Sequence, residues 1–188
     1  MYEVEMKVPG DHDRVTDALT ETDAAHLGTV RQEDTYYDAP DRDFATTDEA
    51  LRIRRETTDD GDCRTVVTYK GPLVDEHSKT RTEAETVVED GESMQAVLSG
   101  LGYEPAARVT KDRERYELDG CVVTLDSVEG LGDFVEVERD IPEEADIAAT
   151  REETAAVLDS LGLDPDDQIR TSYLDLLIEQ SDHDTAPR

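Results

Sequence analysis

The sequence lacks tryptophan and contains only two phenylalanines and two cysteines among 188 residues. Cys63 and Cys121 each share the parity of the apolar side chains in their predicted strands, so we expect two buried free thiols rather than a disulfide framework or a zinc site. No stretch is long and apolar enough to span a membrane, and no positively charged start precedes an apolar run. We therefore expect a soluble, cytoplasmic protein with no membrane partner.

Positive charge is also scarce. The chain has 19 Lys and Arg residues against 49 Asp and Glu residues, which gives a formal net charge of −30 and a pI near 4.2. Such a field repels nucleic acid, so we expect no nucleic-acid partner. An excess of acid is typical of adaptation to high internal salt, where self-repulsion is screened, and this pattern predicts a halophilic protein.

Lysine is the rarest charged residue, and its positions are informative. The four lysines all lie at predicted strand positions, at Lys7, Lys70, Lys79 and Lys111. Exposed lysines would be the first to be replaced on an acidic surface, so the retained ones are candidates for a role inside the fold.

Alternating side chains predict a fold of the α+β class built on antiparallel strands. The predicted strands cover 2–8, 35–37, 50–56, 63–70, 79–88, 108–118, 121–127 and 134–140, and a polar loop is expected before the second. Gly71-Pro72 is expected to end the fourth strand. The predicted helices cover 11–22, 93–101, 146–161 and 173–180. No linker or repeat interrupts the chain, which predicts a single domain over 1–180 and a flexible tail over 181–188.

The first strand shows the design most clearly. Glu3, Glu5 and Lys7 share one face, because successive side chains on a strand point to opposite sides. Two neighbouring carboxylates repel each other unless a positive charge lies between them, and hard oxygen ligands suit magnesium or manganese. A solvated strand face is the alternative interpretation for this stretch on its own.

The same pattern recurs along the chain, with one aliphatic face and one face that carries charges of both signs. The charged positions are Glu3, Glu5, Lys7, Arg52, Arg54, Lys70, Arg81, Glu83, Glu85, Lys111, Arg113, Asp126, Glu136 and Glu138. Strands in this number can curl into a barrel. A barrel filled with charge would enclose a polyanion with a metal, or water, and burying so many charges as ion pairs alone would be costly. The pattern therefore favours a ligand site.

These residues resemble the CYTH superfamily, also called the triphosphate tunnel metalloenzymes. Glu3-Val4-Glu5-Met6-Lys7 matches its ExExK signature, and most of the chain takes part in the resemblance. Further matching segments are Asp34–Asp38, Leu51–Arg54, Thr68–Pro72, Lys79–Glu85, Lys111–Arg113, Leu125-Asp126, Gly130–Glu138 and Ser172–Leu174. Within the superfamily, the sequence is most similar to the class IV adenylyl cyclase (CyaB-like) branch, including its archaeal members.

The resemblance implies a closed antiparallel eight-stranded β-barrel with helices outside, whose tunnel admits a triphosphate and divalent Mg or Mn. A homodimer is implied only by the family. The implied metal ligands are Glu3, Glu5, Asp126, Glu136 and Glu138. The implied triphosphate-binding residues are Lys7, Arg52, Arg54, Lys70, Arg81, Lys111 and Arg113. Glu83 and Glu85 would orient these cations, and Glu5, Lys7 and Lys70 would form the catalytic set.

Three functions follow from this resemblance. The first is an adenylyl cyclase that converts ATP into cyclic AMP and pyrophosphate. The second is a hydrolase of inorganic or nucleoside triphosphate, and the third is a non-catalytic polyphosphate or nucleotide-binding module. Some bacterial cyclases of this class carry a His-Phe pair directly before ExExK, where this sequence begins Met1-Tyr2, so cyclase and hydrolase both remain open.

Overall fold

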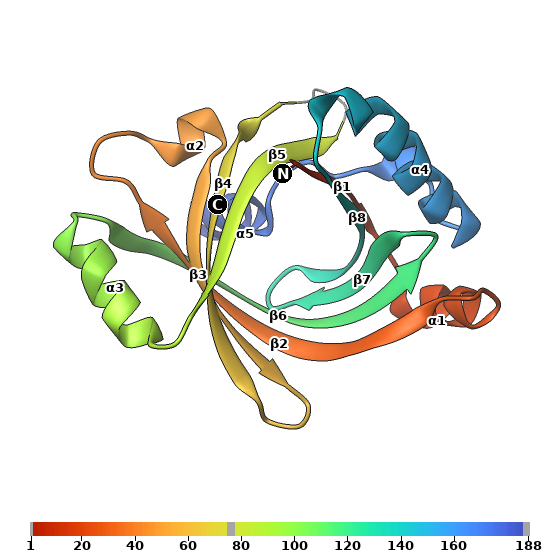
Figure 1. Ribbon diagram of the computed structural model, residues 1–188, viewed down its shortest axis with the longest axis horizontal. Coiled ribbons are helices and arrows are strands. Elements are labelled where there is room, and N and C mark those ends of the chain that lie inside the picture. Colours follow the sequence, from red (N-terminus) through yellow and green to blue (C-terminus); the bar gives the residue numbers. More distant parts are fainter. Residues whose placement is uncertain (1, 75–77, 186–188) are drawn as a thin grey trace.

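The first strand closes the structure upon itself. In this computed structural model, which describes residues 2–74 and 78–185, β1 (Tyr2–Pro9) pairs antiparallel with β5 (Lys79–Val88) on one side and β8 (Gly132–Ile141) on the other. The strand order is β1-β5-β4-β3-β2-β6-β7-β8, and all neighbours are antiparallel (Figure 1). The predicted closed eight-stranded barrel is therefore confirmed. The remaining strands are β2 (Ala25–Asp38), β3 (Ala50–Thr58), β4 (Cys63–Leu73), β6 (Glu104–Leu118) and β7 (Cys121–Val128).

The helices lie outside the barrel (Figure 1). They are α1 (His12–Thr20), α2 (Phe44–Thr47), α3 (Gly91–Gly100), α4 (Ile147–Ser160) and α5 (Tyr173–Thr185), with short 3-10 turns over Glu144–Asp146 and Pro165–Asp167. Asp11, Asp43 and Asp90 begin α1, α2 and α3 by accepting hydrogen bonds from backbone N–H groups of the first turn. Within the ranges described, none of these helices combines the length and the apolar character needed to cross a membrane.

The structure differs from the sequence prediction at several boundaries. The polar loop expected before Thr35 is wrong from Ala25 onward, because β2 begins there and pairs with β6 along its whole length. Strand β4 continues through Gly71-Pro72 to Leu73, and the small helix α2 was not predicted. The predicted flexible tail is helical as far as Thr185, and its last three residues lie outside the described part of the chain.

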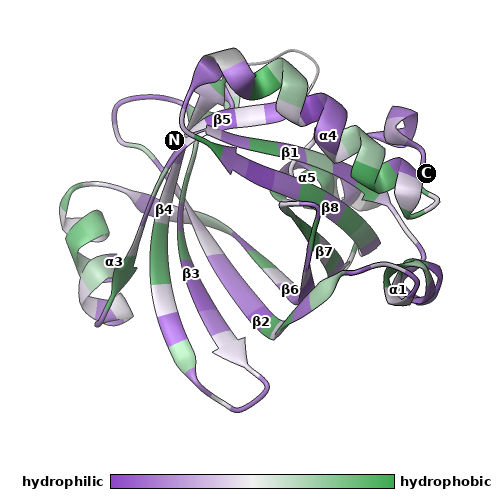
Figure 2. Ribbon diagram, turned by 45° about the vertical axis from the view of Figure 1, so that its right-hand side comes forward, coloured by the Kyte–Doolittle hydropathy of each residue, from purple (hydrophilic) through white to green (hydrophobic). Residues whose placement is uncertain are grey.

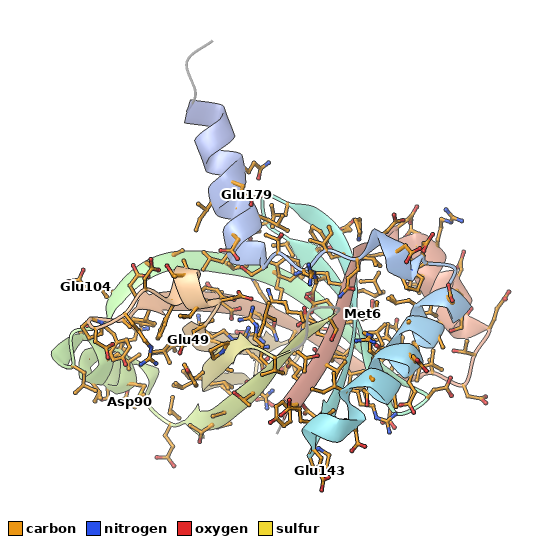
Figure 3. The ribbon with its side chains drawn as sticks, turned by 90° about the horizontal axis from the view of Figure 1, so that it is seen from above. Met6, Glu49, Asp90, Glu104, Glu143 and Glu179 are labelled. Atoms are coloured by element: carbon orange, nitrogen blue, oxygen red, sulfur yellow. The ribbon has the colours of Figure 1, made fainter. Side chains whose placement is uncertain are left out.

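The apolar core lies between the barrel wall and the helices rather than inside the barrel. The largest cluster joins the outer faces of β1, β7 and β8 to α1 and α4, through Val8, Val137, Val15, Leu19 and Leu158 among others. Met6 lies in this layer, between the barrel and α4 (Figure 3). In Figure 2 the strands alternate between green and purple along their length, as expected for walls with one apolar and one polar face.

The two cysteines differ in their environments. Cys121 is buried in this core, as predicted. Cys63 is exposed, so its predicted burial is wrong. It lies at the start of β4 in the hairpin with β3, which extends beyond the barrel wall (Figure 1), where strand parity no longer decides burial.

Helix α5 is held at one end of the barrel by a smaller apolar cluster. Tyr173, Phe134, Val109 and Val128 are buried together, and leucines of α5 pack around them. Gly130, with φ of 84°, permits this approach, since a Cβ there would lie 3.2 Å from Leu177 Cδ2. The rest of α5 projects away from the barrel, as the position of Glu179 shows (Figure 3).

Candidate functional site

The barrel encloses a cavity of about 960 Å³ whose walls are charged. All seven cations predicted to bind triphosphate line it, from five different strands: Lys7, Arg52, Arg54, Lys70, Arg81, Lys111 and Arg113. Lys79 lines it as well, so all four lysines of the chain lie on the inner wall. The scarcity of lysine thus indicated the interior correctly.

Three carboxylates meet on one side of this cavity. One oxygen from each of Glu5, Glu136 and Glu138 lies within 4.8 Å of the other two. Burial, followed by the negative charge of Glu3, raises the pKa of Glu138 to about 8. Carboxylates crowded in this way require a proton or a cation between them, and an all-oxygen ligand set suits Mg²⁺ or Mn²⁺. The residues present therefore fit a divalent metal ion.

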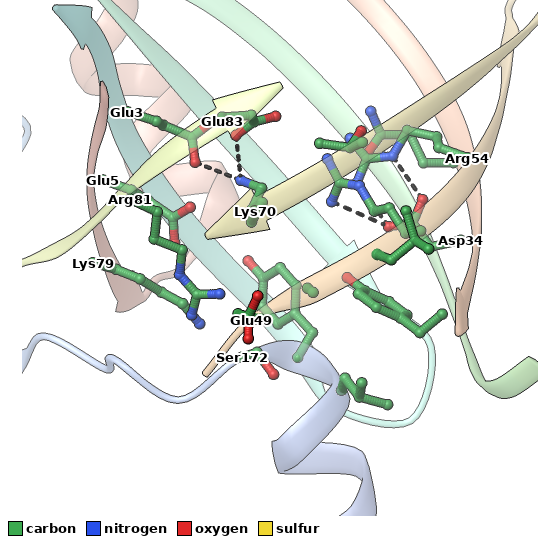
Figure 4. Close-up of a pocket in the computed structure, with 18 of the residues that line it drawn as sticks. Glu3, Glu5, Asp34, Glu49, Arg54, Lys70, Lys79, Arg81, Glu83 and Ser172 are labelled. Atoms are coloured by element: carbon green, nitrogen blue, oxygen red, sulfur yellow. Dashed lines mark hydrogen bonds and ion pairs between the residues drawn. The ribbon is translucent and has the colours of Figure 1, made fainter. Parts of the chain in front are cut away.

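Glu3 and Glu83 lie beside this cluster and bind a lysine instead. The Lys70 ammonium lies 2.5 Å from a carboxylate oxygen of Glu3 and 2.9 Å from one of Glu83 (Figure 4). Burial disfavours the charged lysine, but Glu3 and Glu83 outweigh it and raise the pKa of Lys70. Glu85 accepts a hydrogen bond from the Thr68 hydroxyl at 2.8 Å. Glu83 contacts one of the predicted phosphate-binding cations, as an orienting residue would.

A buried aspartate on β2 holds two arginines of β3. Arg54 donates two parallel hydrogen bonds to Asp34, of 2.6 and 2.7 Å, and Arg52 lies 3.6 Å from the same carboxylate (Figure 4). Burial alone would raise the pKa of Asp34, but the two guanidinium groups reverse this and hold the pKa well below its usual range. The forks of both arginines are thereby fixed toward the cavity.

Asp126 differs from the other predicted metal ligands, because its carboxylate is covered by cations and does not line the cavity. Its fully buried carboxylate accepts hydrogen bonds from Lys111 at 2.8 Å, from Arg113 at 2.5 and 2.6 Å, and from the Tyr173 hydroxyl at 3.0 Å. Burial opposes ionisation, but the charges of Arg113 and Lys111 hold the pKa of Asp126 well below its usual range. Both carboxylate oxygens are thus already engaged by cations and the phenol.

The cations around Asp126 also face the carboxylate cluster. The Arg113 Nη2 that donates to Asp126 also donates a short hydrogen bond to Glu136. Burial, followed by the charge of Arg113, lowers the pKa of Lys111 to about 8. The site therefore places positive side chains directly against the carboxylates suited to a metal.

The sequence prediction missed several residues of the site. Asp34 and Tyr173 belong to matching segments of the resemblance, but received no role. Lys79 was expected inside the fold but received no binding role. It is buried, which lowers its pKa to about 8, and it lines the wall with Arg81 of the same parity. Asp48 follows α2 in a left-handed conformation with φ of 54°, and accepts a hydrogen bond from Arg81 at 2.7 Å. No sequence signal pointed to Asp48.

Comparison with known proteins identifies the family to which this barrel belongs. The sequence profile of the CYTH domain matches residues 1–173, which include every predicted site residue. The chain belongs to the CYTH family. Two relatives of this CYTH protein carry cyclase names. It is 40% identical over 177 residues to a candidate adenylate cyclase of Methanocaldococcus jannaschii, covering 94% of this chain and 98% of that protein. It is 30% identical over 182 residues to the adenylate cyclase CyaB of Aeromonas hydrophila, covering 96% and 90%.

A solved structure shares the architecture of this CYTH barrel. The protein PH1819 from Pyrococcus horikoshii is 39% identical and superposes with a TM-score of 0.88, covering 95% of this chain and 99% of that one. The fold of this chain is thus also that of a solved structure.

Proposed function

We propose that this CYTH protein is a metal-dependent enzyme that binds a triphosphate in its barrel, and that it converts ATP into cyclic AMP and pyrophosphate. The observation that carries the proposal is the convergence of seven phosphate-binding cations and a three-carboxylate cluster on one cavity. The cyclase names of two relatives that span nearly the whole chain support the choice of reaction.

The side chains have different roles according to their chemistry. The lysines and arginines of the wall bind the phosphate oxygens, since forked guanidinium groups and ammonium groups suit a chain of negative charges. Glu5, Glu136 and Glu138 would hold the metal, with Glu3 beside them. Asp126, whose oxygens are already engaged, positions Lys111 and Arg113 and stands outside this ligand set. Bound Mg²⁺ or Mn²⁺ would polarise phosphate oxygens and lower the pKa of a nearby hydroxyl.

In the cyclase reaction the ribose 3′-oxygen attacks the α-phosphorus. The proton of the hydroxyl passes to water, the bond from the α-phosphorus to the bridging oxygen breaks, and pyrophosphate leaves with the bonding electron pair. Lys7, Lys70 and Arg113 hold the phosphate chain and stabilise the charge that develops on the leaving group. Glu5 contributes to catalysis as one of the three carboxylates that would hold the metal.

Hydrolysis of a triphosphate is the second candidate. Every contact assigned above involves the phosphate chain and none involves the ribose or the base. The same cavity would therefore serve inorganic triphosphate or a nucleoside triphosphate, with water in place of the 3′-hydroxyl.

The test is product analysis with the purified full chain. ATP, GTP, thiamine triphosphate and inorganic triphosphate are each incubated with Mg²⁺ or Mn²⁺ in molar KCl. Cyclic AMP with pyrophosphate supports the cyclase, whereas only ADP and phosphate from ATP would establish the hydrolase. Glu5→Gln should abolish turnover while the fold persists. Metal-dependent binding without any product from any substrate would instead indicate a binding module.

A further inference from the structure

Tyr173 presents the face of its ring to two lysines of the site. Its ring centroid lies 4.2 Å from the Lys7 ammonium and 4.9 Å from that of Lys111. Its hydroxyl donates to Asp126, and its side chain is buried. Two lysines predicted to bind phosphate thus share one aromatic ring, and the hydrogen bond to Asp126 fixes the position of that ring.

The chain around Tyr173 fixes its position precisely enough for this contact. The Ser172 hydroxyl accepts a hydrogen bond from the Asp175 backbone N–H at 3.0 Å, so Ser172 begins α5 and Tyr173 is its first residue. Just upstream, the Ile169 N–H donates to the backbone carbonyl of Lys7 at 2.7 Å. The segment leading into α5 is therefore attached to β1 at the residue whose ammonium the ring receives.

The alternative partners of Lys7 are the carboxylates of the metal site. Lys7 lies opposite Glu136 in the β1–β8 ladder and two residues from Glu5 on the same face. Among the described residues, Lys7 forms no ion pair, and the ring of Tyr173 is its cation–π partner. An aromatic face attracts an ammonium group without neutralising it, because the attraction comes from the ring quadrupole. The ammonium therefore keeps its charge and its hydrogen-bond donors for another ligand.

We propose that Tyr173 is a positioning residue for the triphosphate site. Through the face of its ring it holds Lys7 away from Glu5 and Glu136 and beside Lys111, whose ammonium also pairs with Asp126. The inference rests on the proposed triphosphate function. Without the ring, the two ammonium groups repel each other, and Lys7 pairs with Glu5 or Glu136. Phosphate would then have to break that ion pair before it could bind.

The test measures the affinity of the full chain for tripolyphosphate by calorimetry, with EDTA present so that no metal contributes. Tyr173→Phe keeps the ring and should bind within about threefold of the wild type. Tyr173→Leu removes the ring and should bind about tenfold more weakly, a change equivalent to about 1.4 kcal/mol. Equal affinity for Tyr173→Leu and the wild type would overturn the inference.

A fluorinated ring separates electrostatics from packing, and it covers the case in which Tyr173→Leu fails to fold. Replacing Tyr173 by trifluorophenylalanine keeps the shape of the phenylalanine variant but weakens the ring quadrupole. It should bind tripolyphosphate at least about threefold more weakly than Tyr173→Phe. Equal affinities would show that the ring acts only by packing and would overturn the inference.

Phe134 supplies the matched control. Its ring is buried 5.1 Å from that of Tyr173, and no described ammonium lies over its face. Trifluorophenylalanine at position 134 should leave the affinity unchanged, and an equal loss there would count against a specific role of Tyr173. If the wild-type chain itself does not bind tripolyphosphate, the proposed function fails first, so the two failures are distinguishable.

Discussion

The buried carboxylate of Asp126 provides a sharp test of how the cations are held. Lys111, Arg113 and Tyr173 all donate to it. Asp126→Asn keeps the size of the side chain but removes its negative charge. Lys111 would then lose its ion-pair partner, and Arg113 would keep only Glu136.

The expected loss of stability is large. Removing one partner of a buried ion pair costs about 3–5 kcal/mol, because the remaining charge is left unneutralised. Asp112→Asn is the matched control, since Asp112 lies on the neighbouring strand β6 and pairs with Arg31 at the surface, where its side chain is 58% exposed. Exposed ion pairs contribute little, so this variant should unfold like the wild type.

Denaturant unfolding in molar KCl at pH 7 measures the free energy of unfolding of both variants. Tripolyphosphate should restore part of the stability lost by Asp126→Asn, because it supplies negative charge to the same cations and binds only the folded state. The pKa of Asp126 is depressed in the folded protein, so its contribution is present above the ordinary aspartate pKa and is lost as the pH falls below it. An Asp126→Asn variant as stable as Asp112→Asn would refute this account of the buried charges.

Other predictions concern the cavity and the surface. Lys70→Ala should weaken tripolyphosphate binding by roughly ten- to a hundredfold, because a hydrogen bond to a charged group contributes about 1.5–3 kcal/mol. Its melting temperature should change little. Early melting with unchanged binding would contradict the assignment of Lys70 to the phosphate site. Because the pKa of Glu138 is raised to about 8, its contribution to metal-free stability is present below the ordinary glutamate pKa and is lost as the pH rises to about 8. Glu138→Gln should remove this part of the pH dependence of unfolding, and an unchanged dependence would contradict the raised pKa. With a net charge of −30, the protein should melt at a higher temperature in molar than in low KCl; an equal melting temperature would argue against adaptation to salt.

Strand alternation predicted the wall of the barrel because each wall has one apolar and one charged face. It succeeded for β1, where Val4, Met6 and Val8 face outward into the core while Glu5 and Lys7 face the cavity. It failed for the first part of β2. There Gln32 and Asp34 face inward and most of the outward residues are exposed, so neither face is apolar.

Parity also placed residues on the inner face without resolving their depth. It could not show that Lys111 and Arg113 cover the carboxylate of Asp126, since that depends on which cations reach it across strands. It gave no reason to connect Tyr173 with Lys7, because α5 and β1 meet only through the fold of the whole chain. Long-range contacts of this kind are what the sequence alone does not contain.

The central claim is that one cavity binds a divalent metal and a triphosphate side by side. A crystal structure of the full chain with Mn²⁺ and a non-hydrolysable ATP analogue tests it directly through the anomalous signal of manganese. The account predicts a manganese peak between Glu5, Glu136 and Glu138, with the triphosphate against Lys7, Lys70 and Arg113. A metal bound outside the barrel, or an analogue whose phosphates contact none of these cations, would contradict it.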